Sequence, residues 1–254
     1  MLFRSRLTEA RAVAGDNDAA KIEAYQLAMR ACDAYQEAVK SVADPLTITV
    51  QIEYLAVVAP MIKTKQALTD AAALADGIKP RLDALIADGA DDAHLLTVQF
   101  HLSMMRIHLL SRNAKAAAES RAVALSVAEG LHQRLATTTD ITDAYIAEGL
   151  QAERIWPLLE AAKISAANQR LVEVKRLLGA AYFAKRNSRA SIERLVDGVK
   201  LATEIQKADP QIDMRSELVS LYRILGDIYL AGRNKAKAKE FYQTALRLAT
   251  DAGD

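Results

Sequence analysis

Residues 222–245 read YRILGDIYLAGRNKAKAKEFYQTA and decide the fold. Large and small apolar residues recur there at intervals of three and four, which is the spacing of one helix face. Gly232 and Asn234 tolerate the backbone conformations that end one helix and begin the next. The small residues allow two helices to approach closely, and the large ones fill the space around that contact. The positions concerned are Tyr222, Leu225, Gly226 and Tyr229 before the turn and Ala238, Tyr242 and Ala245 after it.

This order of residues resembles the tetratricopeptide repeat, a helical hairpin of about 34 residues. A second copy has Leu178-Gly179, Tyr182, Ser191, Leu195 and Gly198, with Arg186-Asn187 at its turn. A third is weaker, with Met104, Met105 and His108 in place of Leu-Gly-Tyr, Arg112-Asn113 at the turn, and Ala117 and Ala124 as small residues. Residues 14–30 align without gaps to residues 231–247, with nine of seventeen positions identical.

The turn asparagines 187 and 234 are 47 residues apart, which is longer than the usual repeat of about 34 residues. The apolar pattern of the second helix continues to Ala208-Asp209-Pro210, where proline is expected to end it, as at Ala43-Asp44-Pro45. Pro60, Pro80 and Trp156-Pro157 are expected to interrupt the helical pattern elsewhere. We therefore predict an all-α, right-handed α-solenoid in one domain, 1–254, with about six antiparallel hairpins: 1–42, 46–88, 91–137, 140–168, 169–208 and 212–252.

Composition agrees with an all-helical chain and argues against several functions. Of the 254 residues 51% are hydrophobic but only 5% aromatic, and 10 Gly and 5 Pro leave few sharp turns for a many-stranded fold. The 33 basic and 32 acidic residues give a net charge of +1, which argues against nucleic-acid binding. No apolar run is long enough to cross a membrane. The single cysteine, Cys32, is on an apolar stripe and is interpreted as a buried structural thiol rather than a nucleophile.

No catalytic, cofactor or metal site is predicted. The chain has no glycine-rich phosphate loop and no His-Glu-x-x-His, Cys-x-x-Cys or Gly-x-Ser-x-Gly motif. His94, His101 and His108 recur every seven residues, about 10 Å apart along a helix, too far for neighbouring imidazoles to share one metal. We interpret them as core or boundary residues. The prediction is a non-enzymatic protein that needs no cofactor.

The resemblance implies that the first helices of the hairpins line a concave groove that binds a peptide or domain of a partner protein. Carried over by position, the groove residues fall on three hairpins: Arg106 and Leu109; Glu173, Arg176 and Phe183; Arg223, Asp227 and Leu230. The chaperone-binding branch of the family uses Lys and Asn at such positions to hold a terminal carboxylate. Ala180 and Asp227 stand where Asn is needed, so we expect no chaperone tail to bind. The three arginines either pair with acidic groups of a ligand or are exposed without a partner.

Three functions are compatible with these observations. The first is a non-catalytic scaffold for protein–protein interaction, expected in the bacterial cytoplasm, with further self-association through an uncapped last helix. The second is the repeat region of a larger bacterial signalling protein, a kinase or NTPase, because the N-terminus is expected to be incomplete. The third is a sensor that encloses a peptide or small ligand around Tyr145 and Trp156.

Overall fold

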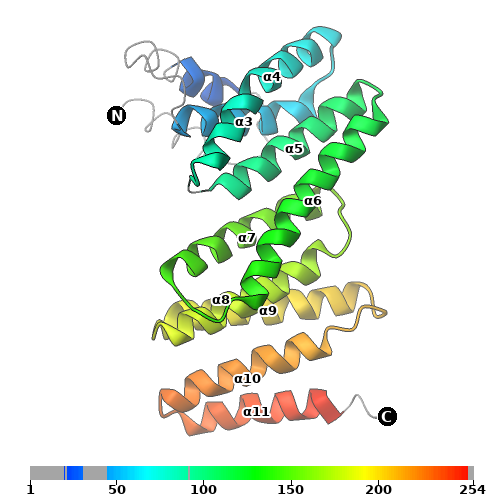
Figure 1. Ribbon diagram of the computed structural model, residues 1–254. Helices are drawn as coiled ribbons and strands as arrows, with labels where there is room; N and C mark the ends of the chain where they lie inside the picture. Colours follow the sequence, from blue (N-terminus) through cyan, green and yellow to red (C-terminus); the bar gives the residue numbers. More distant parts are fainter. Residues whose placement is uncertain (1–19, 21, 31–44, 91, 251–254) are drawn as a thin grey trace. The chain divides into compact units, whose positions relative to one another are not determined.

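The computed structural model describes residues 20, 22–30, 45–90 and 92–250 (Figure 1). Every regular element within these residues is helical, and they include no β-strand. The all-α prediction is therefore confirmed for the described chain. None of the helices in these ranges has the length and apolar character that a bilayer span requires.

The chain divides into two compact units, with the boundary between Val127 and Ala128 inside helix α6 (Ala114–Thr137). The first unit contains α3 (Pro45–Val58), the 3-10 helix η1 (Ala59–Met61), α4 (Lys65–Ala87) and α5 (Ala93–Leu110). Its main core combines buried residues from these helices, among them Ile48, Ile52, Leu55, Ile78, Leu82, Leu96, Phe100 and Ile107. The predicted single-domain organisation stays a prediction.

Local chemistry explains where the helices of the first unit begin. α3 begins at Pro45, where a missing N–H costs nothing because the first helical position has no intrahelical acceptor. The hydroxyl of Thr64 accepts a hydrogen bond from the N–H of Ala67 and caps α4. Residues 22–30 are also helical, with Tyr25 and Ala28 buried against Val50. The rest of the predicted 1–42 hairpin and Cys32 lie outside the described residues.

The second unit contains α7 (Asp143–Ala161), α8 (Ala167–Ala184), α9 (Ser188–Ala208), α10 (Arg215–Ala231) and α11 (Lys235–Thr250). Each of these helices packs on the next, and α8 also contacts α10 (Figure 1). One core cluster joins α8, α9 and α10, with α10 supplying Leu218, Leu221, Ile224, Leu225 and Ile228. α9 ends at Ala208, just before Asp209 and Pro210, as the sequence predicts.

Three arginine–asparagine turns share one geometry. Arg112, Arg186 and Arg233 all have φ values near +60°, in the left-handed region. Within the second of these turns, the N–H of Arg186 donates to the carbonyl of Phe183 at 2.9 Å and that of Asn187 to the carbonyl of Tyr182 at 2.8 Å. These are the paired hydrogen bonds of a Schellman ending. The next residue is always asparagine, and its side chain accepts a hydrogen bond from the N–H three residues later.

This geometry corrects the role expected of Gly232. Gly232 has a φ of −75°, an ordinary right-handed value, and Arg233 carries the positive φ instead. The physical reason is that the Schellman ending needs its left-handed residue one position after the helix cap, and Gly232 is the cap itself. Asn234 does begin the next helix, since its side chain caps α11.

Two prolines expected to interrupt helices lie inside them. Pro80 is within α4 and Pro157 within α7, whereas Pro60 is in η1, between two helices. Both helical prolines are exposed, so water can bond the carbonyls that lose their helical partner, and the helix continues. The predicted hairpin 140–168 is therefore wrong, because α7 runs uninterrupted through Pro157 before the chain turns into α8.

Two glycines confirm the predicted close helix approach. A Cβ added at Gly179 would lie 2.6 Å from the Cγ of Leu195, and one added at Gly226 would lie 2.5 Å from the Cε1 of Tyr242. Real Cβ atoms do not approach other atoms so closely. At both positions a larger residue would displace the facing side chain, so glycine allows α8 to pack closely on α9 and α10 on α11.

Candidate interaction surface

The predicted groove residues of α8 and α10 occupy equivalent positions, 47 residues apart. Arg176 corresponds to Arg223 and Phe183 to Leu230. Because α8 and α10 are in contact within the second unit, the structure places both pairs on neighbouring helices. Arg106 and Leu109 belong to α5 in the first unit, where both side chains are exposed.

The predicted arginines have no partner among the described residues. Arg106, Arg176 and Arg223 form no ion pair or hydrogen bond with any residue that the structure describes. Arg106 and Arg223 are exposed, whereas Arg176 is half-buried. Burial raises the pKa of Tyr145, and the nearby charge of Arg176 acts in the opposite direction. A half-buried guanidinium without a carboxylate has its donors available for an anion.

Glu173, also predicted to face a ligand, is held by the protein. Its carboxylate accepts a hydrogen bond from Nε2 of His132 at 2.7 Å and one from Nη1 of Arg170 at 3.1 Å. The bond from His132 contributes most to lowering the pKa of Glu173, and Arg170 adds to it while burial opposes it. Arg170 also pairs with Glu129 at 3.3 Å. The cluster joins α6 to α8. Glu173 therefore holds these two helices together, and its charge is already paired within the protein.

Asp227 is engaged in a similar way. The hydroxyl of Tyr242 on α11 donates to its carboxylate at 2.7 Å, and this hydrogen bond raises the pKa of Tyr242. The bond fixes the tyrosine ring over Gly226, on which it packs. Asp227 therefore contributes to the α10–α11 contact. Of the two polar groove residues predicted in this hairpin, only Arg223 has no hydrogen-bond partner among the described residues.

His132 and Trp156 pack together in the interior of the second unit, a contact that the sequence did not predict. Their rings meet edge to face with centroids 6.2 Å apart, and Trp156 is only 1% exposed. Tyr145 is also buried, and its hydroxyl donates to the carbonyl of Leu135 at 3.1 Å. The residues named for an enclosed ligand pocket thus contribute to packing among α6, α7 and α8. Nδ1 of His132 and Nε1 of Trp156 have no partner among the described residues.

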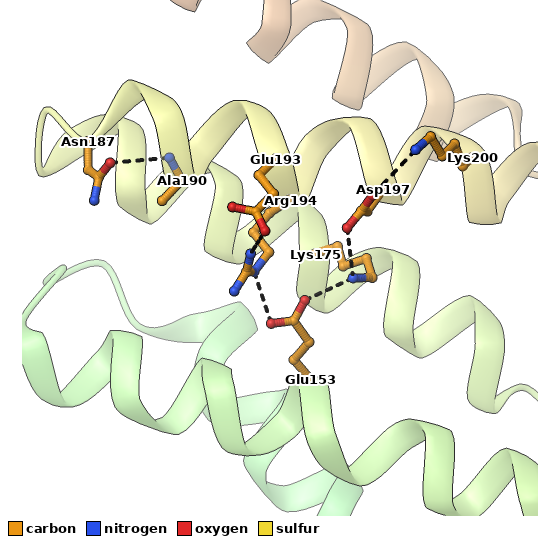
Figure 2. A network of polar contacts seen from close by, with 8 residues as sticks. All are labelled: Glu153, Lys175, Asn187, Ala190, Glu193, Arg194, Asp197 and Lys200. Carbon is orange, nitrogen blue, oxygen red and sulfur yellow. Dashed lines mark hydrogen bonds and ion pairs between the residues drawn. The ribbon is translucent and has the colours of Figure 1, made fainter. Parts of the chain in front are cut away.

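A second polar cluster joins three helices and was not foreseen (Figure 2). Glu153 on α7 bonds Nζ of Lys175 on α8 at 2.8 Å and Nε of Arg194 on α9 at 3.0 Å. These three side chains are only 14–20% exposed. Lys175 also lies 3.9 Å from Asp197, which in turn lies 3.8 Å from Lys200. Arg194 also pairs with Glu193 at 3.1 Å, so three carboxylates face three cations and the cluster balances its own charge. It therefore serves to align α7, α8 and α9.

No sequence signal would have revealed these clusters. Glu153 and Arg194 are 41 residues apart, and His132 and Glu173 are also 41 apart. Helical periodicity assigns each residue to a face of its own helix but does not state which face of another helix it meets.

The histidines of α5 do not converge. His94, His101 and His108 are half-buried, and burial, which contributes most, lowers the pKa of His101. Within the described ranges no three His, Cys, Asp or Glu side chains are placed to hold a metal ion. Comparison with known protein families gives no matching family, and comparison with curated proteins gives no matching sequence.

Proposed function

We propose that this chain is a scaffold for protein–protein interaction, built as a right-handed solenoid of tetratricopeptide-like hairpins. Its partner is a peptide or domain with acidic groups, held along the first helices of successive hairpins. The chain carries out no catalysis in this proposal. It acts by presenting a row of cations and half-exposed apolar side chains on a rigid helical frame.

The observation that carries the proposal is the pair Arg176 and Arg223. They occupy the same position of neighbouring helices, 47 residues apart, and neither has an internal carboxylate within the described chain. The other three charged residues of α8, which are Arg170, Glu173 and Lys175, all have partners. Arginine donors bond carboxylates in a bidentate geometry, which favours acidic groups as the ligand.

Half-exposed apolar residues accompany the two arginines. Phe183 on α8 is half-buried and packs partly on the core cluster, whereas Leu230 on α10 is 49% exposed. Interfaces are enriched in aromatic residues and arginine, and their central apolar anchors carry most of the binding energy. An acidic partner with apolar anchors would therefore use both kinds of side chain.

Charge reversal tests the proposal. The double variant Arg176→Glu/Arg223→Glu should lose the proteins captured by the wild-type chain from a cell extract, measured by quantitative mass spectrometry. A like charge facing an acidic ligand costs binding energy and slows association. Expected losses are at least tenfold for the specific partners.

The matched control is Arg121→Glu/Arg189→Glu, which makes the same change in net charge at two exposed arginines outside this row. Its captured proteins should equal those of the wild type. If the two double variants lose the same proteins, or if neither loses any, Arg176 and Arg223 do not bind the partner. Far-ultraviolet circular dichroism confirms that each variant stays helical.

A further inference from the structure

An apolar groove opens between α10 and α11, and it includes Leu230 but neither Arg176 nor Arg223. It has a volume of about 380 Å³ and is lined by Leu230, Lys235, Ala238, Lys239, Tyr242 and Leu246, together with Gln243. Leu230 is 49% exposed and Leu246 is 65% exposed. Leu246 is the most exposed large apolar side chain in the described part of the chain. Apolar side chains that converge in a groove mark an interaction site more often than scattered ones do.

The preceding hairpin shows what covers the equivalent positions. Counting back 47 residues from Leu230, Lys239, Gln243 and Leu246 leads to Phe183, Ile192, Val196 and Val199. All four pack against the core cluster to which α10 contributes half of the buried residues. A Cβ added at Gly198 on α9 would lie 3.1 Å from Leu221 of α10, so the two helices are in direct contact. A helix therefore covers α8–α9 (Figure 1).

The charges of the two hairpins differ at these positions. Lys235 and Lys239 replace Ser188 and Ile192. None of the seven residues that line the groove is acidic. The nearby carboxylate of Asp227 already accepts the hydroxyl of Tyr242. The lysines thus bring positive charge to the rim without acidic groups in the lining.

We propose that the α10–α11 groove binds an acidic amphipathic helix of a partner protein, in the place that α10 takes on the α8–α9 hairpin. The apolar face of that helix covers Leu230, Tyr242 and Leu246, and its flanking Glu or Asp side chains pair with Lys235 and Lys239. A second copy of the same groove is a poor occupant, because face-to-face pairing would oppose these lysines with each other. The inference deepens the proposed scaffold function by naming the chemistry of one partner.

A displayed library of 18-residue helical peptides tests the proposal on the full chain. Apolar residues occupy one helix face, and flanking positions are free to be Asp, Glu, Lys, Arg, Ser or Gln. Selected peptides should be enriched in Asp and Glu at the flanks. Peptides without this enrichment, or no binding peptides at all, would overturn the proposal.

Variants then locate the site by fluorescence anisotropy with the selected peptide. Leu246→Ser should weaken binding at least tenfold, and Lys235→Glu/Lys239→Glu should weaken it by a similar factor. Leu110→Ser is the matched control, since Leu110 is an exposed leucine (38%) on α5 that no proposed surface includes, and this variant should bind the peptide as the wild type does. Because Leu246 and both lysines are exposed, their substitution leaves the core packing in place.

Two further results separate this surface from the other interpretations. Equal loss of peptide binding for Leu246→Ser and Leu110→Ser would show that the peptide does not use the groove. A concentration-dependent dimer in sedimentation that Leu246→Ser abolishes would make a second copy the occupant and overturn the acidic-helix proposal. The variant Arg176→Glu/Arg223→Glu should still bind the selected peptide, because neither arginine lines the groove. If the groove proposal fails, the proposal for Arg176 and Arg223 is therefore still decided by its own charge-reversal test.

Discussion

The α8–α9 and α10–α11 hairpins have the same backbone plan and different chemistry at equivalent positions. Both have glycine at the helix crossing, Gly179 and Gly226, and the same arginine–asparagine turn. At the positions of Lys175 and Arg194, however, the second hairpin has Tyr222 and Phe241. The first pair is bridged by Glu153, whereas the aromatic rings stack with centroids 6.1 Å apart.

This difference shows which parts of a repeat are constrained. The helix crossing leaves no room for a Cβ, so its residue type is the same in both hairpins. The neighbouring positions only have to fill space and leave no buried polar group without a partner. An ion cluster and an aromatic stack both meet these two conditions. The two hairpins satisfy these positions differently: α7, which precedes the first hairpin, supplies the carboxylate that bridges Lys175 and Arg194, whereas the two rings of the second hairpin contact each other.

Gly179→Ala should have the largest effect on stability, a loss of about 3 kcal/mol, because overpacking a closed core displaces buried side chains. The Cβ would meet Leu195, which is fully buried and cannot move outwards. Gly226→Ala should cost about 1 kcal/mol less, since the obstructing ring of Tyr242 is only half-buried and can turn away. Urea unfolding measures both losses.

Gly130→Ala in α6 is the control for helix propensity. A Cβ at Gly130 would meet nothing within 4 Å, so this substitution should stabilise the protein by up to about 1 kcal/mol. Equal effects of alanine at positions 130 and 179 would contradict the close-packing explanation.

Glu153→Gln should have the next largest effect, a loss of about 2 kcal/mol. Two mostly buried cations lose their shared anion, and their 14–20% exposure reduces the penalty below that of a fully buried pair. The aromatic pair of the other hairpin has no such charge to lose, so Phe241→Leu should cost only about 1 kcal/mol. The loss for Glu153→Gln should also shrink in high salt, whereas the loss for Phe241→Leu should not. Identical salt dependence of the two variants would contradict this assignment.

Arg186→Gly and Arg233→Gly should have the smallest effects, each a gain of about 0.5–1 kcal/mol in unfolding free energy. Glycine adopts a positive φ without the steric cost that a side chain incurs. Because the two turns are alike, the gains should be equal and additive. Arg189→Gly, at the start of α9 with ordinary helical geometry, should instead destabilise the chain. A loss of stability in either turn variant would show that the arginine side chain contributes there.

The helices and their turns were predictable from the sequence because they depend on local interactions. Apolar spacing located the helices, Asn187 and Asn234 marked their starts, and Gly179 and Gly226 marked the crossings. The proline rule failed at Pro157 because whether a helix survives a proline depends on the exposure of the freed carbonyls. Arg176 and Arg223 were predicted by position, but that they have no ion-pair partner among the described residues became visible only in the structure.

The residue pattern by itself determined that this chain is helical and contains related hairpins, since helical periodicity and turn chemistry act over a few residues. Tertiary structure alone decided which charged groups are already paired. Glu173 and Asp227 looked the same in the sequence as Arg176 and Arg223, but the first two meet His132 and Tyr242 across a helix interface. Such contacts join residues 15 to 41 positions apart, and only the packed helices bring them within bonding distance.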